Sequence, residues 1–252
     1  MGAAYDSYDY LSYWNERKYE HESEVYALRC FLDRIPKIAK AIELGGGFGR
    51  LAPYYLFRAK TVTLTDPSAK LLSIARKQLS AYSNMKYVQT SLENAKNKFR
   101  KGSFDLVLTV RVLHHIPNVS EAFDIIEYLV EPNGHVIFEF ANKMHGKAVI
   151  SHLLKGDFKF LNDTNSIDVR SAESIKAKTL PFLNHHPKAI EDELSKHGFE
   201  VVQKRSVSNI RSVSAKKHIP ISVLLWVEKL VQIPFAYLNF GPSIFILARK
   251  KG

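Results

Sequence analysis

The sequence predicts an α/β protein built on an open sheet of mostly parallel strands. Through residues 1–142, short apolar or β-branched segments alternate with single helical segments, and a glycine-rich loop follows the first apolar segment. Strands separated by one helix pair in parallel through right-handed crossovers. Ligands bind such sheets at the carboxyl ends of the strands, so we expect the chemistry of this protein at that edge.

The elements of the first half follow from periodicity and from turn residues. Residues 61–65 are β-branched at four of five positions and stop at Asp66-Pro67, while apolar side chains recur at helical spacing between residues 68 and 82. Glu131–Gly134 has the composition of a turn. The predicted strands are residues 39–44, 61–65, 86–89, 104–110 and 135–140, and the predicted helices are residues 50–59, 68–82 and 119–130.

The second half is less regular. Residues 143–186 have no clean period, and we interpret them as an insertion or lid. A helix is predicted over residues 187–197, with proline first and glycine just past its end, followed by strands over 199–204 and 243–248. Residues 230–248 hold no charge across 19 positions, but Pro234 and Gly241-Pro242 argue against one membrane-spanning helix. We expect a buried strand there, preceded by an apolar helix that faces substrate or a membrane.

The positive charge is concentrated in the second half. Of 36 Lys+Arg and 25 Asp+Glu, residues 1–142 hold 18 and 16, whereas residues 143–252 hold 18 and 9. This excess predicts an anionic small molecule or an anionic membrane surface as partner, with ordinary solvated surface as the alternative. Cys30 is the one cysteine, and the first residues show no secretory pattern, so a cytoplasmic protein without disulfides is expected.

The segment Glu43–Gly49 (Glu-Leu-Gly-Gly-Gly-Phe-Gly) is the most informative one. Glycines between a strand and a helix let a ligand approach the backbone closely. Glu43, two positions before the first glycine, favours a cationic ligand group over a pyrophosphate, and Asp66 ends the next strand where it can accept hydrogen bonds from two ribose hydroxyls. The loop also fits the looser dinucleotide fingerprint, with Ala52 as its last residue, so a nicotinamide cofactor stays an alternative.

Together with four further segments, this loop resembles the class I S-adenosylmethionine-dependent methyltransferases, specifically the type 11 group that methylates small molecules and lipid quinones. The resemblance implies a Rossmann-like sheet of seven mostly parallel strands with an antiparallel last strand, helices on both faces and lid insertions. It implies one domain over 1–252, with a helical cover (1–35), a cofactor-binding half (36–142) and substrate-side insertions (143–186 and 207–240). The further segments are Asp66 after residues 62–65, Ser103–Val107, Val112–Pro117 and Gly241–Ala248.

The resemblance also implies S-adenosyl-L-methionine as cofactor and a role for each matching residue. The glycines would wrap its methionine part, Glu43 would face its amino group and Asp66 would hold its ribose. The acidic residue that often binds adenine in this family is replaced here by Ser91 or Thr90, with Glu93 as a nearby alternative. The predicted cofactor-binding residues are Arg17, Tyr19, Glu43, Gly45, Gly46, Gly47, Gly49, Asp66, Pro67, Ser91, Leu92, Arg111 and Val112.

The segment 14–20 resembles the N-terminal helix that covers the cofactor in such enzymes. Arg17 could pair with the cofactor carboxylate, or could be an exposed helix charge. Six of the 12 tyrosines, Tyr19 among them, occur by residue 26. Their rings could attract a sulfonium, although ordinary packing of helix on sheet is favoured for most of them.

Two histidines after the fourth predicted strand are the candidate bases. Methyl transfer is an in-line displacement, and a base is needed only where the nucleophile must lose a proton early. His114 or His115 could take that proton near neutral pH, or could be structural. His185-His186 is interpreted as a solvated turn before a helix. No metal site is predicted, because adjacent histidines seldom reach one ion together.

The favoured function is methyl transfer to a small, apolar or amphipathic acceptor. A nucleic-acid methyltransferase is disfavoured, because the sequence contains no acidic-proline-aromatic tetrad and no nucleic-acid-binding module. A non-catalytic cofactor-binding protein and a nicotinamide oxidoreductase stay open. The identity of the acceptor and the oligomeric state are not readable from the sequence.

Overall fold

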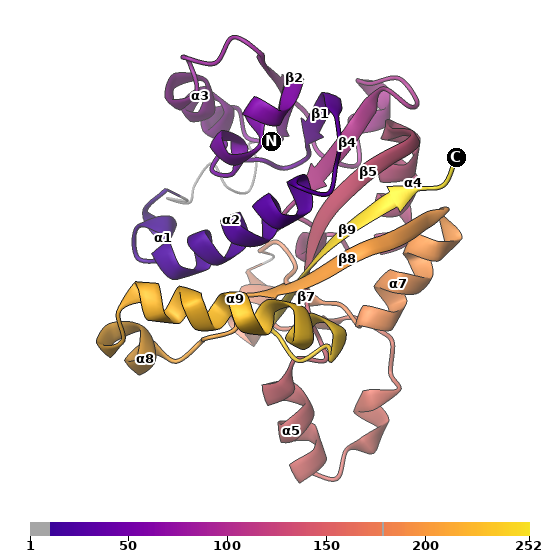
Figure 1. Cartoon of the computed structure of the whole chain (residues 1–252). Helices are drawn as coiled ribbons and strands as arrows, with labels where there is room; N and C mark the ends of the chain where they lie inside the picture. The colour runs from indigo at the N-terminus through magenta and orange to yellow at the C-terminus, as the bar shows by residue number, and fades with distance from the viewer. Residues whose placement is uncertain (1–10, 178) are drawn as a thin grey trace.

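The computed structural model describes residues 11–177 and 179–252, and its centre is a sheet of seven strands in the order β3-β2-β1-β4-β5-β9-β8 (Figure 1). β9 is antiparallel to both of its neighbours, β5 and β8, and the other pairs are parallel. The predicted fold class is thus confirmed, including the antiparallel last strand. The strands are β1 (Ile38–Glu43), β2 (Ala59–Asp66), β3 (Met85–Gln89), β4 (Phe104–Thr109), β5 (Val130–Ala141), β6 (Ile167–Asp168), β7 (Leu183–Asn184), β8 (Phe199–Val207) and β9 (Ser243–Lys250).

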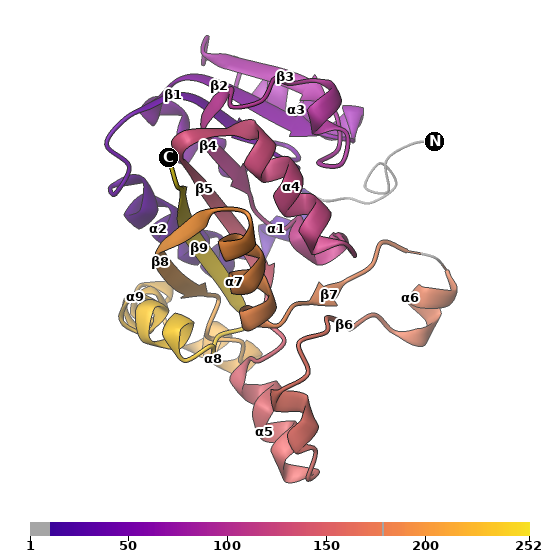
Figure 2. The same ribbon diagram turned by 90° about the vertical axis from the view of Figure 1, so that its right-hand side faces the viewer.

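Helices cover both faces of the sheet (Figures 1 and 2). One buried apolar cluster joins α4 and α7 to the sheet, and a second joins α2 to the opposite face, where α9 packs along β8 and α2. Five short 3₁₀ segments complete the described part: η1 (Ala52–Tyr54), η2 (Leu56–Arg58), η3 (Ala95–Asn97), η4 (Leu113–His115) and η5 (Phe158–Leu161). The α-helices are α1 (Ser12–Asn15), α2 (Lys18–Leu32), α3 (Ala69–Gln78), α4 (Val119–Leu129), α5 (Gly146–Leu154), α6 (Ala172–Lys176), α7 (Pro187–Lys196), α8 (Val213–His218) and α9 (Ile221–Tyr237).

Three predicted elements differ from the structure. The predicted helix 50–59 is two 3₁₀ turns, because Pro53 lacks a backbone donor and Tyr55 turns inward to hydrogen-bond Glu43. The predicted turn 131–134 lies inside β5 as an irregularity in its pairing with β4, with Asn133 at a positive φ of 64°. The predicted cover helix 14–20 is broken at Arg17, between α1 and α2.

The apolar segment of the second half forms α9, which runs unbroken through Pro234 in its last turns and ends before Gly241. Within residues 11–177 and 179–252, no helix combines the length and the apolarity that crossing a bilayer requires. Tyr5, Tyr8 and Tyr10, and with them the first part of the predicted cover, lie outside the described residues.

Candidate active site

Three adjoining cavities open at the carboxyl ends of the parallel strands, where the strand order reverses between β1 and β4. We name them the loop cavity (about 30 Å³), the middle cavity (about 310 Å³) and the large cavity (about 1020 Å³). Arg111, directly beyond β4, lines all three. An open parallel sheet binds ligands in this crevice, so the three cavities form one candidate site.

The glycine loop is shaped by two close contacts. Gly45 has a φ of 68°, and a Cβ on it would lie 2.5 Å from Cγ2 of Val112, so no larger residue fits. Gly47 has a φ of 56°, and its amide donates to Oδ2 of Asp66 at 2.9 Å. The loop backbone therefore lines the loop cavity itself, with no side chain between it and a ligand.

Glu43 closes the floor of the loop cavity. Its buried carboxylate accepts a hydrogen bond of 2.6 Å from the hydroxyl of Tyr55. Burial raises the pKa of Glu43 to about 7, although the Tyr55 hydrogen bond and the nearby Arg50 both lower it. A cation bound in the loop cavity would find a carboxyl group ready to ionise near neutral pH.

Asp66 lies at the wall of the middle cavity. Its carboxylate accepts from the amide of Gly47 at 2.9 Å and from the amide of Ser68 at 2.8 Å. Two backbone donors hold the carboxylate in one orientation, as recognition of a vicinal diol requires. Beyond it the middle cavity is lined by Pro67, Leu71, Ser91, Leu92, Glu93, Val110, Val112, His115, Ile116 and Leu180.

A buried ion cluster, which no pattern in the sequence predicted, joins the N-terminal cover to this edge. Glu24 of α2 is 1% exposed and pairs with Arg50, which follows the glycine loop, and with Arg111 at 2.5 Å. Burial alone would raise the pKa of Glu24, but the two guanidinium groups outweigh burial and keep that pKa below its usual value. The ring of Trp14 lies 3.6 Å from Cζ of Arg50 and 4.9 Å from Cζ of Arg111, so α1 closes over the cluster.

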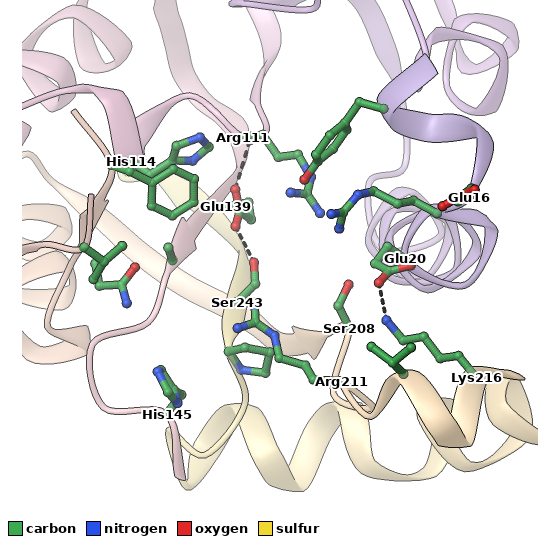
Figure 3. A pocket seen from close by; sticks show the side chains of 18 of the residues that line it. Glu16, Glu20, Arg111, His114, Glu139, His145, Ser208, Arg211, Lys216 and Ser243 are labelled. Carbon is green, nitrogen blue, oxygen red and sulfur yellow. Dashed lines mark hydrogen bonds and ion pairs between the residues drawn. The ribbon is translucent and has the colours of Figure 1, made fainter. Parts of the chain in front are cut away.

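The large cavity lies between residues 12–20 of the N-terminal cover, the end of β5, the start of β9, and residues from the segments 145–169, 182–184 and 208–217 (Figure 3). Its lining holds five basic side chains against three carboxylates. Glu20 pairs with Lys216, and Glu139 accepts from the backbone amide of Arg111 at 2.9 Å and from the hydroxyl of Ser243. The five basic residues are Arg17, Arg111, Arg211, Lys216 and Lys217, and the three acidic ones are Glu16, Glu20 and Glu139.

Two of these guanidinium groups lack a carboxylate partner among the described residues. Arg17 lies 4.1 Å above the ring of Tyr13, and no ion pair links it to an acid in the described ranges. Figure 3 shows Arg211 pointing into the cavity. Solvent reaches Arg211 through the opening, yet surrounding protein and the charge of Arg111 lower its pKa. The large cavity is therefore electropositive and suited to an anionic group.

His114 and His115 lie on different cavities. His114 lines the large cavity 4.5 Å from the ring of Phe182, and burial lowers its pKa well below the usual value, so the ring is neutral at pH 7. His115 lines the middle cavity, and its Nδ1 lies 2.7 Å from the carbonyl of Pro181, which makes Nδ1 the donor. Glu139, another titratable group on the large cavity and absent from our predictions, has its pKa raised by burial.

Some predicted residues lie elsewhere. Tyr19 lines none of the three cavities, because its hydroxyl donates to Glu228 of α9. His185 and His186 are buried rather than solvated: His185 contacts the carbonyl of Leu113 at 3.0 Å, and His186 caps α7. The other predicted residues, except Gly49, each line a cavity: Glu43 and Gly46 line the loop cavity, and Arg17 lines the large cavity. The middle cavity is lined by Gly45, Gly47, Asp66, Pro67, Ser91, Leu92, Arg111 and Val112.

A switch-point crevice with a glycine loop, a carboxylate held by two backbone amides and a second carboxyl group beside the loop is typical of a nucleoside-cofactor-binding protein of the Rossmann-like class. Comparison with known proteins narrows that class. Residues 42–138 match the type 11 family described as "Methyltransferase domain". The predicted resemblance to this family is confirmed over these residues.

Individual relatives agree with this assignment. The chain is similar to the non-reducing polyketide synthase nvfA of Aspergillus novofumigatus, 26% identical over 134 residues, which are 50% of this chain but 6% of that protein. It is similar to the ubiquinone biosynthesis O-methyltransferase of Vibrio campbellii, 31% identical over 41% of this chain and 44% of that one. Among solved structures, N-methyltransferase NodS of Bradyrhizobium japonicum, in complex with S-adenosyl-L-homocysteine, has a TM-score of 0.60 at 14% identity and covers 98% of this chain and 94% of its own, which shows a shared fold.

Proposed function

We propose that the protein is an S-adenosylmethionine-dependent methyltransferase that acts on a small, amphipathic acceptor with an anionic group. The observation that carries the proposal is the position of Arg111, which lines the cavities beside the glycine loop and Asp66 and also the large electropositive cavity. This shared wall supports a cofactor site and an acceptor site that lie side by side. Such proximity is what an in-line displacement requires of the protein.

The chain's own residues would divide the work of binding the cofactor. The two backbone amides that hold Asp66 fix its carboxylate at the wall of the middle cavity, where it would accept from ribose hydroxyls, and the glycine loop would hold the methionine part. Glu43, with its pKa near 7, would ionise against an ammonium group. The cofactor supplies a methyl group on a sulfonium, which the acceptor takes with loss of a neutral thioether. The prediction that Arg17 meets the cofactor carboxylate stays a prediction, since Arg17 lines the acceptor side.

The side chains that line the large cavity indicate the chemistry of the acceptor. Arg17 and Arg211 would meet an anionic head group, while Val169, Phe182 and Val213 offer apolar contact. The similarity to a polyketide synthase and to an enzyme of ubiquinone biosynthesis supports an oxygen-rich, partly apolar acceptor. The insertions 143–186 and 207–240 both contribute to this lining, which supports their proposed role on the substrate side.

We further infer that His114 is the base where the acceptor must lose a proton. Its ring is held neutral by burial and by neighbouring positive charges, so it can accept a proton without first losing one. His115 would then contact the cofactor side, and Glu139 is the alternative base. We place the protein in the cytoplasm, in peripheral contact with an anionic membrane surface, with charge in residues 143–252 as support.

The test is calorimetric titration of the purified chain with S-adenosylhomocysteine and, separately, with NAD and NADP. We expect tight binding of the first alone, and a loss of about 100-fold or more in the Gly47→Arg variant, since an arginine at this positive φ would fill the loop cavity. Binding of a nicotinamide nucleotide without S-adenosylhomocysteine would overturn the proposal. Binding without methyl transfer to any acceptor would favour a non-catalytic protein.

A further inference from the structure

The strongest unexplained feature is helix α9, which buries two polar side chains while several large apolar side chains face outward. Its buried residues recur every four positions and are Leu224, Glu228, Gln232 and Ala236. Surface helices of globular proteins ordinarily turn their large apolar side chains toward the core and their polar ones toward solvent. The outward apolar side chains, which we call the α9 face, are Val223, Trp226, Leu230, Ile233 and Tyr237.

Polar anchors prevent α9 from rotating to bury this face. Glu228 accepts from the hydroxyls of Tyr19 and Ser23 and from the side-chain amide of Asn209, the last at 3.0 Å. Gln232 donates to the carbonyl of Ser23 at 3.0 Å and accepts from Arg205 at 3.3 Å. Turning the helix would leave these buried groups without hydrogen-bond partners, which destabilises a fold. The outward position of the apolar side chains is thus built into the fold.

Several large apolar side chains on this side of the molecule are exposed. Trp226 is 62% exposed and Leu230 is 58% exposed. The end of α5 presents Leu154 at 84% exposure, and η5, which follows it, begins with the exposed Phe158. Figures 1 and 2 both show α5 projecting on the same side of the molecule as α8 and α9. Contiguous exposed apolar patches mark sites of contact with a protein or a membrane.

The charges around the α9 face favour an anionic partner. Within residues 211–240 the basic side chains are Arg211, Lys216, Lys217 and Lys229, and the single carboxylate, Glu228, is buried against α2. A second copy of the chain docked on this face by two-fold symmetry would bring like charges together. Apolar and aromatic side chains with lysines beside them fit the headgroup region of an anionic bilayer.

We propose that the α9 face, with the end of α5, docks on the surface of a membrane that contains anionic lipids. The docked surface adjoins the large cavity, because Val213, Lys216 and Lys217 of α8 line its mouth. The α9 face is thus the surface that makes the membrane contact inferred above. Only one consequence rests on the proposed function, namely that an amphipathic acceptor would enter the large cavity from the bilayer. Docking itself requires no methyl transfer.

The experiment is co-sedimentation of the whole chain with phosphatidylcholine vesicles, with and without phosphatidylserine, at low and high salt. We expect binding to the phosphatidylserine vesicles that weakens at high salt. The double variant Trp226→Glu/Leu230→Glu should lose at least about tenfold in partitioning. Lys217→Glu should lose about fivefold, on anionic vesicles only. The matched control is Phe57→Glu, because Phe57 is 68% exposed on η2, outside the proposed surface, and should bind as the native chain does.

Tryptophan fluorescence reports the same event independently. The chain has two tryptophans, Trp14 and Trp226. We expect a blue shift on anionic vesicles that is absent in Trp226→Phe, while Trp226→Phe still sediments with the vesicles. Thermal unfolding and titration with S-adenosylhomocysteine, both without vesicles, should be the same for the native chain and the double variant.

Three results would overturn the docking proposal. They are no binding of the native chain to anionic vesicles, equal binding by the folded double variant, and a native dimer that the double variant converts to a monomer. The last result would assign the face to contact between copies. A failure of the proposed function would give a different result from these three, because the native chain would then not bind S-adenosylhomocysteine.

Discussion

The edge that carries the glycine loop and the exposed surface around α8 and α9 differ in whether their side chains have partners within the chain. At the edge, Asp66, Glu43 and Glu24 are held by hydrogen bonds or ion pairs from within the chain. On the other side, Arg211 points into an open cavity and Trp226 points to solvent. Side chains that already have partners within the chain pre-organise a site for one fixed ligand. Exposed charged and apolar side chains gain favourable contacts only when a binding partner is present.

The largest effect that would break this comparison concerns Glu24. Replacing Glu24 by alanine leaves Arg50 and Arg111 facing each other without the carboxylate between them, and we expect a loss of about 3 kcal/mol in the free energy of unfolding. Urea denaturation followed by circular dichroism measures it. Glu22→Ala, two residues away on α2, is the control and should stay within about 0.5 kcal/mol of the native chain. Equal effects in the two variants would mean that the ion cluster does not hold the cover.

Asp66 tests whether the edge is built for a ribose. We expect Asp66→Asn to weaken S-adenosylhomocysteine binding by about 10- to 100-fold, because charge-assisted hydrogen bonds to the hydroxyls are lost. Asp105 offers a matched control, since its carboxylate also accepts from two backbone amides, those of Ala39 and Lys40, at the opposite end of the sheet. Asp105→Asn should lower the melting temperature and leave the affinity unchanged. An affinity loss shared by both variants would point to general destabilisation.

The pH dependence of binding sharpens the role of Glu43. Its pKa is raised to about 7, so the carboxyl group is mostly protonated at pH 5.5 and must lose a proton to face an ammonium group. Affinity for S-adenosylhomocysteine should therefore rise about tenfold between pH 5.5 and 7, with proton release on binding. In the protein without ligand, pH affects folding in the opposite direction. Ionisation of this buried carboxyl group lowers the free energy of unfolding as pH rises from 4.5 to 7. Calorimetry in buffers of different ionisation enthalpy measures the released proton, and Glu43→Gln should release none there.

The smallest expected effect concerns Arg211. Because its positive charge lies near Arg111 and Arg17, Arg211→Gln should raise the melting temperature by about 1–3 °C. The same variant should bind octanoate, an anionic amphipathic probe, several-fold more weakly, while S-adenosylhomocysteine affinity stays within about twofold. Scanning calorimetry and titration give both values. Unchanged octanoate binding would remove Arg211 from the proposed acceptor site.

Much of the edge was predictable because its signals are local in the chain. Neighbouring residues alone specify the Glu43–Gly49 loop, the strand end at Asp66-Pro67 and the alternation of strand and helix. In the structure, the loop and Asp66 lie together at one edge of the sheet. Where a local signal competed with packing, the prediction was wrong: residues 52–54 and 56–58 form 3₁₀ turns in place of the predicted helix 50–59. The cofactor role expected of Tyr19 stays a prediction, and its hydroxyl donates to Glu228 of α9.

By itself the sequence determined the strand and helix periods, the glycine loop and the position of the excess charge. Only the tertiary structure decided the Glu24 cluster, whose partner Arg111 is 87 positions away, and the orientation of α9, set by contacts such as Tyr19 to Glu228 across 209 positions. The physical reason is that α9 is apolar on most sides, so its period cannot tell which side faces inward. Buried polar groups that must find partners make that choice, and those partners come from distant parts of the chain.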